Sequence, residues 1–295
     1  RPAVSSRALL RLVLGLFGAL ALAACSRPVE VRPALWLVEG PGGQKAWLFG
    51  TIHALPDPVD WRSQRIEAAL GASDRLMLEV AAIGDDRATA RVFARLAASP
   101  GLPPLDQRVP ADLRDDLADA LKDGGIKPGS LDGYESWAAA LMLQQAAMRA
   151  GASDSGNGID RALASGYSRP VDEFEGASVQ LGIFDRLPES AQRTLLTSAI
   201  EGQDSYEAET RRLAKAWANA DLALIERETD GQLSRDPVLR EALLVGRNRV
   251  WAARLEAILK QGAHPFVAVG AAHLVGRDGL PAMLAARGYR VTRLQ

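Results

Sequence analysis

The chain has 295 residues, of which 47% are hydrophobic and 24% are charged, values that exclude a disordered or collagen-like protein. Its net charge is -1, so no overall positive field favours nucleic acid as a partner. The length allows a sizeable core, and composition does not decide between one large α/β domain and a domain with a substantial insertion. Partners must therefore be inferred from a site.

The N-terminus has the pattern of a targeting segment. Three arginines, Arg1, Arg7 and Arg11, precede an uncharged run of thirteen residues, Leu12 to Ala24. This run suits the hydrophobic region of a signal peptide and is too short to span a bilayer. The run closes with "LAAC", Leu22 to Cys25, which resembles the lipobox of bacterial lipoproteins, in which cleavage leaves the cysteine as a lipid-modified first residue. The alternative is an ordinary secretory signal with an incidental cysteine.

The lipobox interpretation predicts a signal peptide over residues 1–25 and a membrane anchor at Cys25. Three acyl chains, as in mature lipoproteins of Gram-negative bacteria, would hold far more firmly than the marginal anchoring of one chain. Ser26 follows the cysteine, which by resemblance favours the outer membrane, with the protein facing the periplasm. Cys25 is the single cysteine, so the mature chain would have no disulfide and no cysteine nucleophile. No second apolar run predicts a transmembrane helix.

The first elements predict a strand, a helix and another strand. After a linker over residues 26–33, the segments "ALWLVEG" and "KAWLFGTI" flank "PGGQ", which predicts a β-hairpin turning at Pro41 to Gln44. In "PVDWRSQRIEAALGAS", apolar residues recur at helical spacing until Gly71. "RLMLEV", Arg75 to Val80, then predicts a short buried strand. This order is typical of a parallel sheet.

The rest of the chain alternates helical tracts with strands. The pattern is helical at about 85–165 and 188–261, and "SRPVDEFEG" between these tracts predicts a strand. The end of the chain predicts a strand in "HPFVAVGAAH", a helix in "GLPAMLAARG" and a closing strand in "YRVTRLQ". We therefore predict a single α/β domain over residues 34–295, with a central, mostly parallel sheet and large helical insertions.

Two of the predicted strands end in the same pattern, Gly-x-x-His. It gives Gly50 with His53 in "AWLFGTIH", and Gly270 with His273 in "PFVAVGAAH". Ligands of open α/β sheets gather outside the carboxyl ends of the strands, where these histidines fall, and glycine there lets the backbone approach a ligand closely. A strand-end histidine is also often a capped structural group, and the third histidine, His264, is predicted to lie in a loop.

Two glutamates lie in comparable places. Glu79 belongs to the predicted strand "RLMLEV", and Glu175 ends "PVDEFE". A carboxylate at such a position is costly unless it is paired or bound to a cation. Structural alternatives stay open, because Glu79 can pair with Arg75 or Arg247 and Glu175 can cap the turn at Gly176. Two further acidic residues on the same strand compete for the role of Glu175: Asp172 and Glu173.

Together, His53, His273, Glu79 and Glu175 predict a divalent-metal site, with one carboxylate free to act as a general base on a bound water. The mixed nitrogen and oxygen ligands admit Zn²⁺, Mn²⁺, Co²⁺ or Fe²⁺. The same four residues are also compatible with a protein that binds a metal complex, haem or a peptide and does not catalyse a reaction. We expect no nucleic-acid partner and a peptide or another small molecule as ligand.

Six segments in order resemble one family. They are "ALWLVEGPGGQKAWLFGTIHALP", "RLMLEV", "NGIDRAL", the spacing from Glu175 to Gln180 in "EGASVQ", "GRNRVW" and "FVAVGAAHLVGRDGLPAMLAARGYRV". They resemble the TraB/GumN family, also called TraB/PrgY, which includes the Tiki metalloproteases. The match extends over most of the mature chain, although "EFEGA" stands where the family more commonly has "LETxE".

This resemblance implies a sheet of the erythromycin-esterase and ChaN-like kind. It also implies a peptidase dependent on Mn²⁺ or Co²⁺, with histidines in the positions of His53 and His273 and a glutamate like Glu79. The family's Arg-Asn pair corresponds to Arg247 and Asn248, for which we expect a role in holding a substrate carboxylate or in supporting Glu79. We therefore expect a lipid-anchored, metal-dependent hydrolase acting on peptides, and a non-catalytic binding lipoprotein as the alternative.

Overall fold

The computed structural model describes residues 31–81, 86–150, 155–203, 205–233 and 235–295. The predicted signal peptide, including the lipidation site Cys25, lies outside these residues. None of the helices in the part of the chain that is described is long and apolar enough to cross a membrane.

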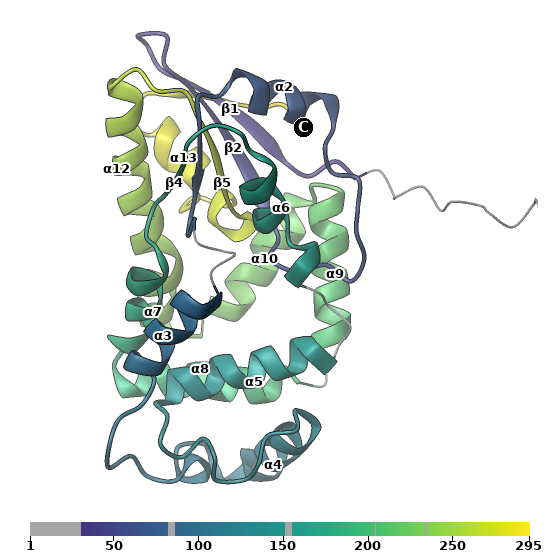
Figure 1. Cartoon of the computed structure of the whole chain (residues 1–295), viewed down its shortest axis with the longest axis vertical. Helices are drawn as coiled ribbons and strands as arrows, with labels where there is room; N and C mark the ends of the chain where they lie inside the picture. Colours follow the sequence, from purple (N-terminus) through teal and green to yellow (C-terminus); the bar gives the residue numbers. More distant parts are fainter. Residues whose placement is uncertain (1–30, 82–85, 151–154, 204, 234) are drawn as a thin grey trace, which may run out of the picture.

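A mostly parallel sheet lies at the centre of the described part of the chain (Figure 1), which confirms the predicted α/β class. The six strands have the order β4-β3-β5-β2-β1-β6, and β1 is the one that runs against its neighbours. The bounds are β1 (Leu35–Glu39), β2 (Lys45–Thr51), β3 (Arg75–Leu78), β4 (Val171–Glu173), β5 (Pro265–Gly270) and β6 (Arg290–Arg293).

The predicted hairpin and the pairing of β2 with β5 set the register of the sheet. Strands β1 and β2 are antiparallel and joined by a turn in which Gly43 has a φ of 81°, a value that glycine adopts without steric cost. Strand β2 then pairs in parallel with β5, placing Thr51 opposite Gly270. Because the two strands end at the same level, the two Gly-x-x-His segments leave the sheet at the same edge.

The predicted helical tracts form several separate helices. One helix between the two tracts, α7, was not predicted. The α-helices are α2 (Gln64–Ala72), α3 (Asp86–Leu96), α4 (Arg114–Asp123), α5 (Ser136–Ala150), α6 (Ile159–Gly166), α7 (Ala177–Asp185), α8 (Glu189–Glu201), α9 (Tyr206–Ala218), α10 (Leu222–Leu233), α11 (Pro237–Arg240), α12 (Gly246–Lys260) and α13 (Leu280–Ala285), with a π-helical turn at Glu241–Val245 and a 3₁₀-helix, η5, at Ala271–Leu274.

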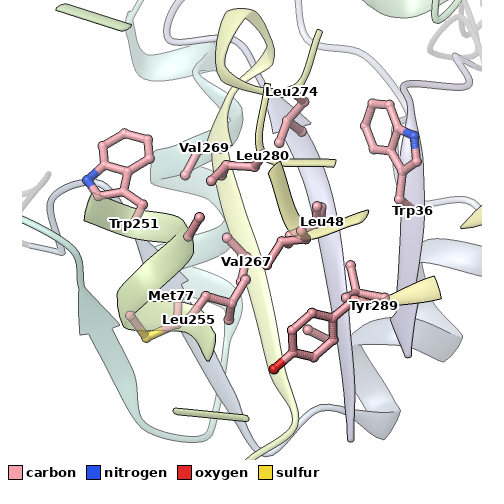
Figure 2. Packing of buried hydrophobic residues seen from close by; sticks show 14 of the residues in the cluster. Trp36, Leu48, Met77, Trp251, Leu255, Val267, Val269, Leu274, Leu280 and Tyr289 are labelled. Atoms are coloured by element: carbon pink, nitrogen blue, oxygen red, sulfur yellow. The ribbon is translucent and has the colours of Figure 1, made fainter. Parts of the chain in front are cut away.

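The central strands are apolar on both faces because helices cover both. On one face, Leu48 and Val267 pack with Trp251 and Leu255 of α12 and with residues of α13 (Figure 2). Their strand neighbours point the other way, toward α2 and α6. Strands buried on both faces have near-continuous apolar sequences, which explains "AWLF" and "FVAV".

Helices from both tracts, together with α7, lie beyond the carboxyl edge of the sheet. In Figure 1 the parallel strands run from the hairpin end toward α3, α5, α7 and α8, which lie below the sheet in that view. Helices α4, α5 and α8 share a hydrophobic cluster of their own. The edge at which the histidines emerge therefore lies on the side of these helices, although most of the His53 side chain is exposed.

Two strand boundaries differ from the prediction. Strand β3 ends at Leu78 and β4 ends at Glu173, so Glu79 and Glu175 lie just beyond the strands and not within them. The backbone remains paired there, since the amide of Glu175 donates to the carbonyl of Glu79 over 3.0 Å. Gly176, with a φ of 81°, then turns the chain into α7.

Candidate functional site

Side chains from three strand ends face one point beside Gly270. A Cβ atom placed on Gly270 would lie 3.3 Å from Glu79 Oε1, 3.7 Å from His53 Nε2 and 3.8 Å from His273 Cδ2. These residues follow β3, β2 and β5, three neighbouring strands of the parallel part of the sheet. The structure thus brings three of the four predicted ligands to one location.

Glu79 is buried and held by three donors. The amide of Gly270 donates to its Oε1 over 2.8 Å, and Arg247 donates to its Oε2 over 2.7 Å, with Gln180 at 3.4 Å from the same oxygen. Burial acts to raise the pKa of Glu79, but His273, Arg247, His53 and the Gly270 amide together lower it to about 2. Glu79 is therefore a carboxylate anion at neutral pH.

Glu175 faces the guanidinium of Arg247. Arg247 Nε donates to Oε1 over 2.8 Å and Nη2 donates to Oε2 over 2.9 Å, and Trp251 Nε1 donates to Oε1 over 3.0 Å. Both oxygens of Glu175 are thus bound within the protein. Of the two structural partners that the sequence left open for Glu79, Arg247 is the one observed, since Arg75 instead donates to Asp172 over 3.1 Å.

Arg247 bridges the two carboxylates from α12. Its guanidinium carbon lies 4.6 Å from the ring centroid of Trp251, one turn further along the helix, and its Nη1 lies 3.3 Å from His273 Nε2. Burial acts to lower the pKa of Arg247, but Glu175 and Glu79 raise it. Two buried carboxylates face one guanidinium, so one negative charge of this group is not compensated by Arg247. Such a charge favours a cation nearby.

The proton of His273 is assigned by the contacts of Asn248. Asn248 Nδ2 donates to the carbonyls of Asp278 (2.8 Å) and His273 (3.3 Å), so its Oδ1 is the atom that lies 2.6 Å from His273 Nδ1. An amide oxygen only accepts, which places the proton on Nδ1 and leaves a lone pair on Nε2. Burial lowers the pKa of His273 to about 4, so the ring is neutral.

His53 has a carboxylate partner instead. Its Nδ1 lies 2.8 Å from Asp160 Oδ2, and its Nε2 has no hydrogen-bond partner among the described residues. Asp160 raises the pKa of His53 against the opposing effect of burial. Because 71% of the His53 side chain is exposed, water screens this pair and weakens the shift.

The other predicted residues take supporting places or lie elsewhere. The Gly50 carbonyl accepts from Trp217 Nε1 over 2.7 Å, and the place where a Gly50 Cβ would stand packs against η5. Glu173 accepts the amide of Ala81 over 2.8 Å. His264 precedes β5 and therefore lies at the amino end of that strand.

Four residues of the site were given no role from the sequence, although all four lie in the segments that carry the family resemblance: Thr51, Asp160, Gln180 and Trp251. Trp251 follows Arg247 by four positions, and this helical spacing was a usable signal in "GRNRVW". Asp160 lies in the family segment "NGIDRAL", but the sequence does not indicate its partner, which is 107 positions away.

Histidine nitrogens and a carboxylate oxygen at this location are of the types that divalent cations bind. Both histidines hold Nδ1 against an oxygen acceptor, the arrangement typical of metal-binding histidines. His273 Nε2 and Glu79 Oε1 are 4.0 Å apart, which leaves room for an ion at about 2.1 Å from each. No group of three or more His, Cys, Asp or Glu side chains in the described ranges is already arranged to hold a metal ion.

Comparison with known proteins confirms the family resemblance. The model of the TraB/PrgY/gumN family matches residues 34–293. Two relatives, each described as "Uncharacterized protein YbaP", come from Shigella flexneri and from Escherichia coli strain K12, and each is 27% identical over 247 residues, covering 83% of this chain and 89% of the relative. No solved structure gives a significant match. Because the family model spans most of the chain, the protein belongs to the TraB/PrgY/gumN family.

Proposed function

We propose that the protein is a metal-dependent hydrolase that acts on peptides, with His53, His273 and Glu79 as the metal ligands. The observation that carries this proposal is that His53 Nε2, Glu79 Oε1 and the ring of His273 lie around one point beside Gly270, with each histidine held at Nδ1 by an oxygen. A divalent metal bound there would polarise a substrate carbonyl and lower the pKa of a bound water. The peptide substrate and the erythromycin-esterase or ChaN-like fold rest on the family resemblance.

The contacts of the carboxylates divide their roles in this proposal. Glu79, with its lowered pKa, suits a permanently charged ligand better than a general base, which works best with a pKa near the working pH. Glu175 holds Arg247 in place through two parallel hydrogen bonds. Arg247 binds both carboxylates, so neither is free to take a proton in this arrangement. The general-base role stays a prediction.

Metal analysis of the purified protein tests the site. After incubation with Mn²⁺, Co²⁺, Zn²⁺ or Fe²⁺ and removal of excess ion, we expect the parent chain to retain a stoichiometric divalent ion. We expect His53→Ala and His273→Ala to lose it, because each removes a ligand. His264→Ala is the matched control and should retain the ion, since His264 lies at the amino end of β5.

Two outcomes would contradict the metal site: a parent chain that retains none of the four ions, or folded His53→Ala and His273→Ala variants that retain as much as the parent. Hydrolysis is tested separately with a broad peptide library in the presence of each ion. A chain that holds metal and peptide but cleaves nothing would favour the sequestering alternative.

We also propose that the protein is anchored in the bacterial envelope by lipid on Cys25, facing the periplasm, with the outer membrane favoured. The support is the sequence pattern of an uncharged run that closes in "LAAC" before Ser26. Cells fed radioactive palmitate are expected to label the parent chain and not Cys25→Ser, because only the thiol can form the thioether. Equal labelling of both chains would contradict the anchor.

A further inference from the structure

We propose that Asp160 is a positioning residue for His53, which fixes the proton of the imidazole on Nδ1 and leaves the lone pair of Nε2 directed at the space beside Gly270. This role concerns the same site and, as far as metal affinity is concerned, rests on the proposed function. Asp160 was not among the residues predicted from the sequence, and its position in the structure assigns the role.

The carboxylate of Asp160 is buried and its two oxygens have separate partners. Asp160 is 4% exposed, its Oδ1 accepts the Thr51 hydroxyl over 2.5 Å, and its Oδ2 lies 2.8 Å from His53 Nδ1. An ionised carboxylate only accepts hydrogen bonds, so Nδ1 must be the donor whether His53 is neutral or charged. In the neutral ring the lone pair is then on Nε2, the nitrogen that lies 3.7 Å from the place of a Gly270 Cβ.

The segment around Asp160 is built against the His53 loop at several points. Asn157 Nδ2 donates to the carbonyl of Leu55 over 3.3 Å, and the amide of Ile159 donates to the carbonyl of Ile52 over 3.0 Å. A Cβ on Gly158 would lie 2.3 Å from the carbonyl oxygen of His53, so only glycine permits this approach.

Each residue of "NGID" thus meets the loop that follows β2. These contacts fix the path of the His53 backbone, and Asp160 fixes the ring. Although 71% of the His53 side chain is exposed, its ring has a hydrogen-bond partner at Nδ1 in Asp160.

The two histidines therefore have different supports. His273 is held by the neutral amide of Asn248, whereas His53 is held by an anion. Both arrangements leave Nε2 as the acceptor or ligand atom. A charged acceptor makes the opposite nitrogen of His53 more electron-rich, which strengthens its bond to a cation.

Nitrogen NMR of the histidine rings tests the role of Asp160 directly, since the chain has only three histidines and single His→Ala variants assign their signals. In the parent chain we expect His53 to carry a proton on Nδ1. In Asp160→Ala we expect the proton of the neutral ring to move to Nε2, the tautomer that a free histidine side chain prefers, while His273 keeps its signals because Asn248 is untouched. Asp172→Ala, which removes a carboxylate paired with Arg75, is the matched control and should leave His53 unchanged.

Metal affinity gives the second readout. If His53 is a ligand, Asp160→Ala should weaken Mn²⁺ or Zn²⁺ binding by about 10- to 100-fold, and Asp172→Ala should not. Should Asp160→Ala fail to fold, Asp160→Asn keeps the shape without the charge, and a loss of several-fold in affinity is expected.

A His53 ring that keeps its proton on Nδ1 in Asp160→Ala would overturn the proposal, as would an Asp160→Asn chain that binds metal as tightly as the parent. The NMR measurement needs no metal ion. A parent chain that binds no metal would therefore defeat the proposed function and leave the role of Asp160 to be decided by the ring signals.

Discussion

Replacing Arg247 with methionine is expected to lower the free energy of unfolding by about 3 to 5 kcal/mol. Arg247 is 12% exposed in its side chain, and the carboxylates that it bridges, Glu79 and Glu175, are 8% and 6% exposed. Methionine fills similar volume but donates no hydrogen bond, so it would leave two buried negative charges next to each other. Removing one partner of a buried ion pair is costly for this reason, even where the intact pair contributes little to stability.

Urea denaturation measures this effect, and the same helix supplies a control. Arg249 also lies on α12 and pairs with Glu241, but 59% of its side chain is exposed, so Arg249→Met should change the unfolding midpoint little. Adding Glu79→Gln and Glu175→Gln to Arg247→Met should recover part of the loss, because neutral amides need no counter-charge. An Arg247→Met chain as stable as the parent would contradict the bridging role.

Replacing Gly270 with alanine is expected to abolish metal binding while the protein stays folded. The added methyl group would stand at the point that His53 Nε2, Glu79 Oε1 and the His273 ring face, at 3.3 to 3.8 Å from them. Gly270 has a φ of -49° and a ψ of 135°, a conformation that alanine adopts readily. The change thus fills the space of the site without straining the backbone.

Isothermal titration with Mn²⁺ or Zn²⁺ checks the binding, and thermal unfolding checks the fold. Gly71→Ala in α2 is the matched control, because a Cβ there would meet no atom within 4 Å. The control should bind as the parent does. A Gly270→Ala chain that binds either ion with parental affinity would show that the metal does not lie beside Gly270.

The elements that the sequence predicted well are those whose signal is local. The hairpin was readable because two apolar runs flank "PGGQ", and β5 was readable because "PFVAVG" is apolar without interruption. The meeting of the two Gly-x-x-His segments at one edge followed from a general rule, since the carboxyl ends of parallel strands share an edge. Helix α7 was not predicted, because the segment before it was assigned to a strand ("SRPVDEFEG") and its first residues were considered only as part of the family segment "EGASVQ".

The contacts of the charged residues were less readable. The sequence offered Arg75 and Arg247 equally as partners of Glu79, and only the packing of α12 on the sheet distinguishes them. It also treated Glu175 as equivalent to Glu79, whereas Arg247 and Trp251 engage both oxygens of Glu175. Periodicity shows which side of a helix is buried, but not which charge it meets there.

The sequence by itself determined the α/β class, the family and the strand-end positions of His53 and His273, because apolar patterns and motifs are properties of neighbouring residues. The tertiary structure alone decided that Asp160 holds His53, that Asn248 holds His273 and that Arg247 joins the two glutamates. Two of these contacts join residues more than 100 positions apart, His53 with Asp160 and Glu79 with Arg247. Hydrogen-bond direction and charge balance depend on such distances in space, which a sequence pattern does not contain.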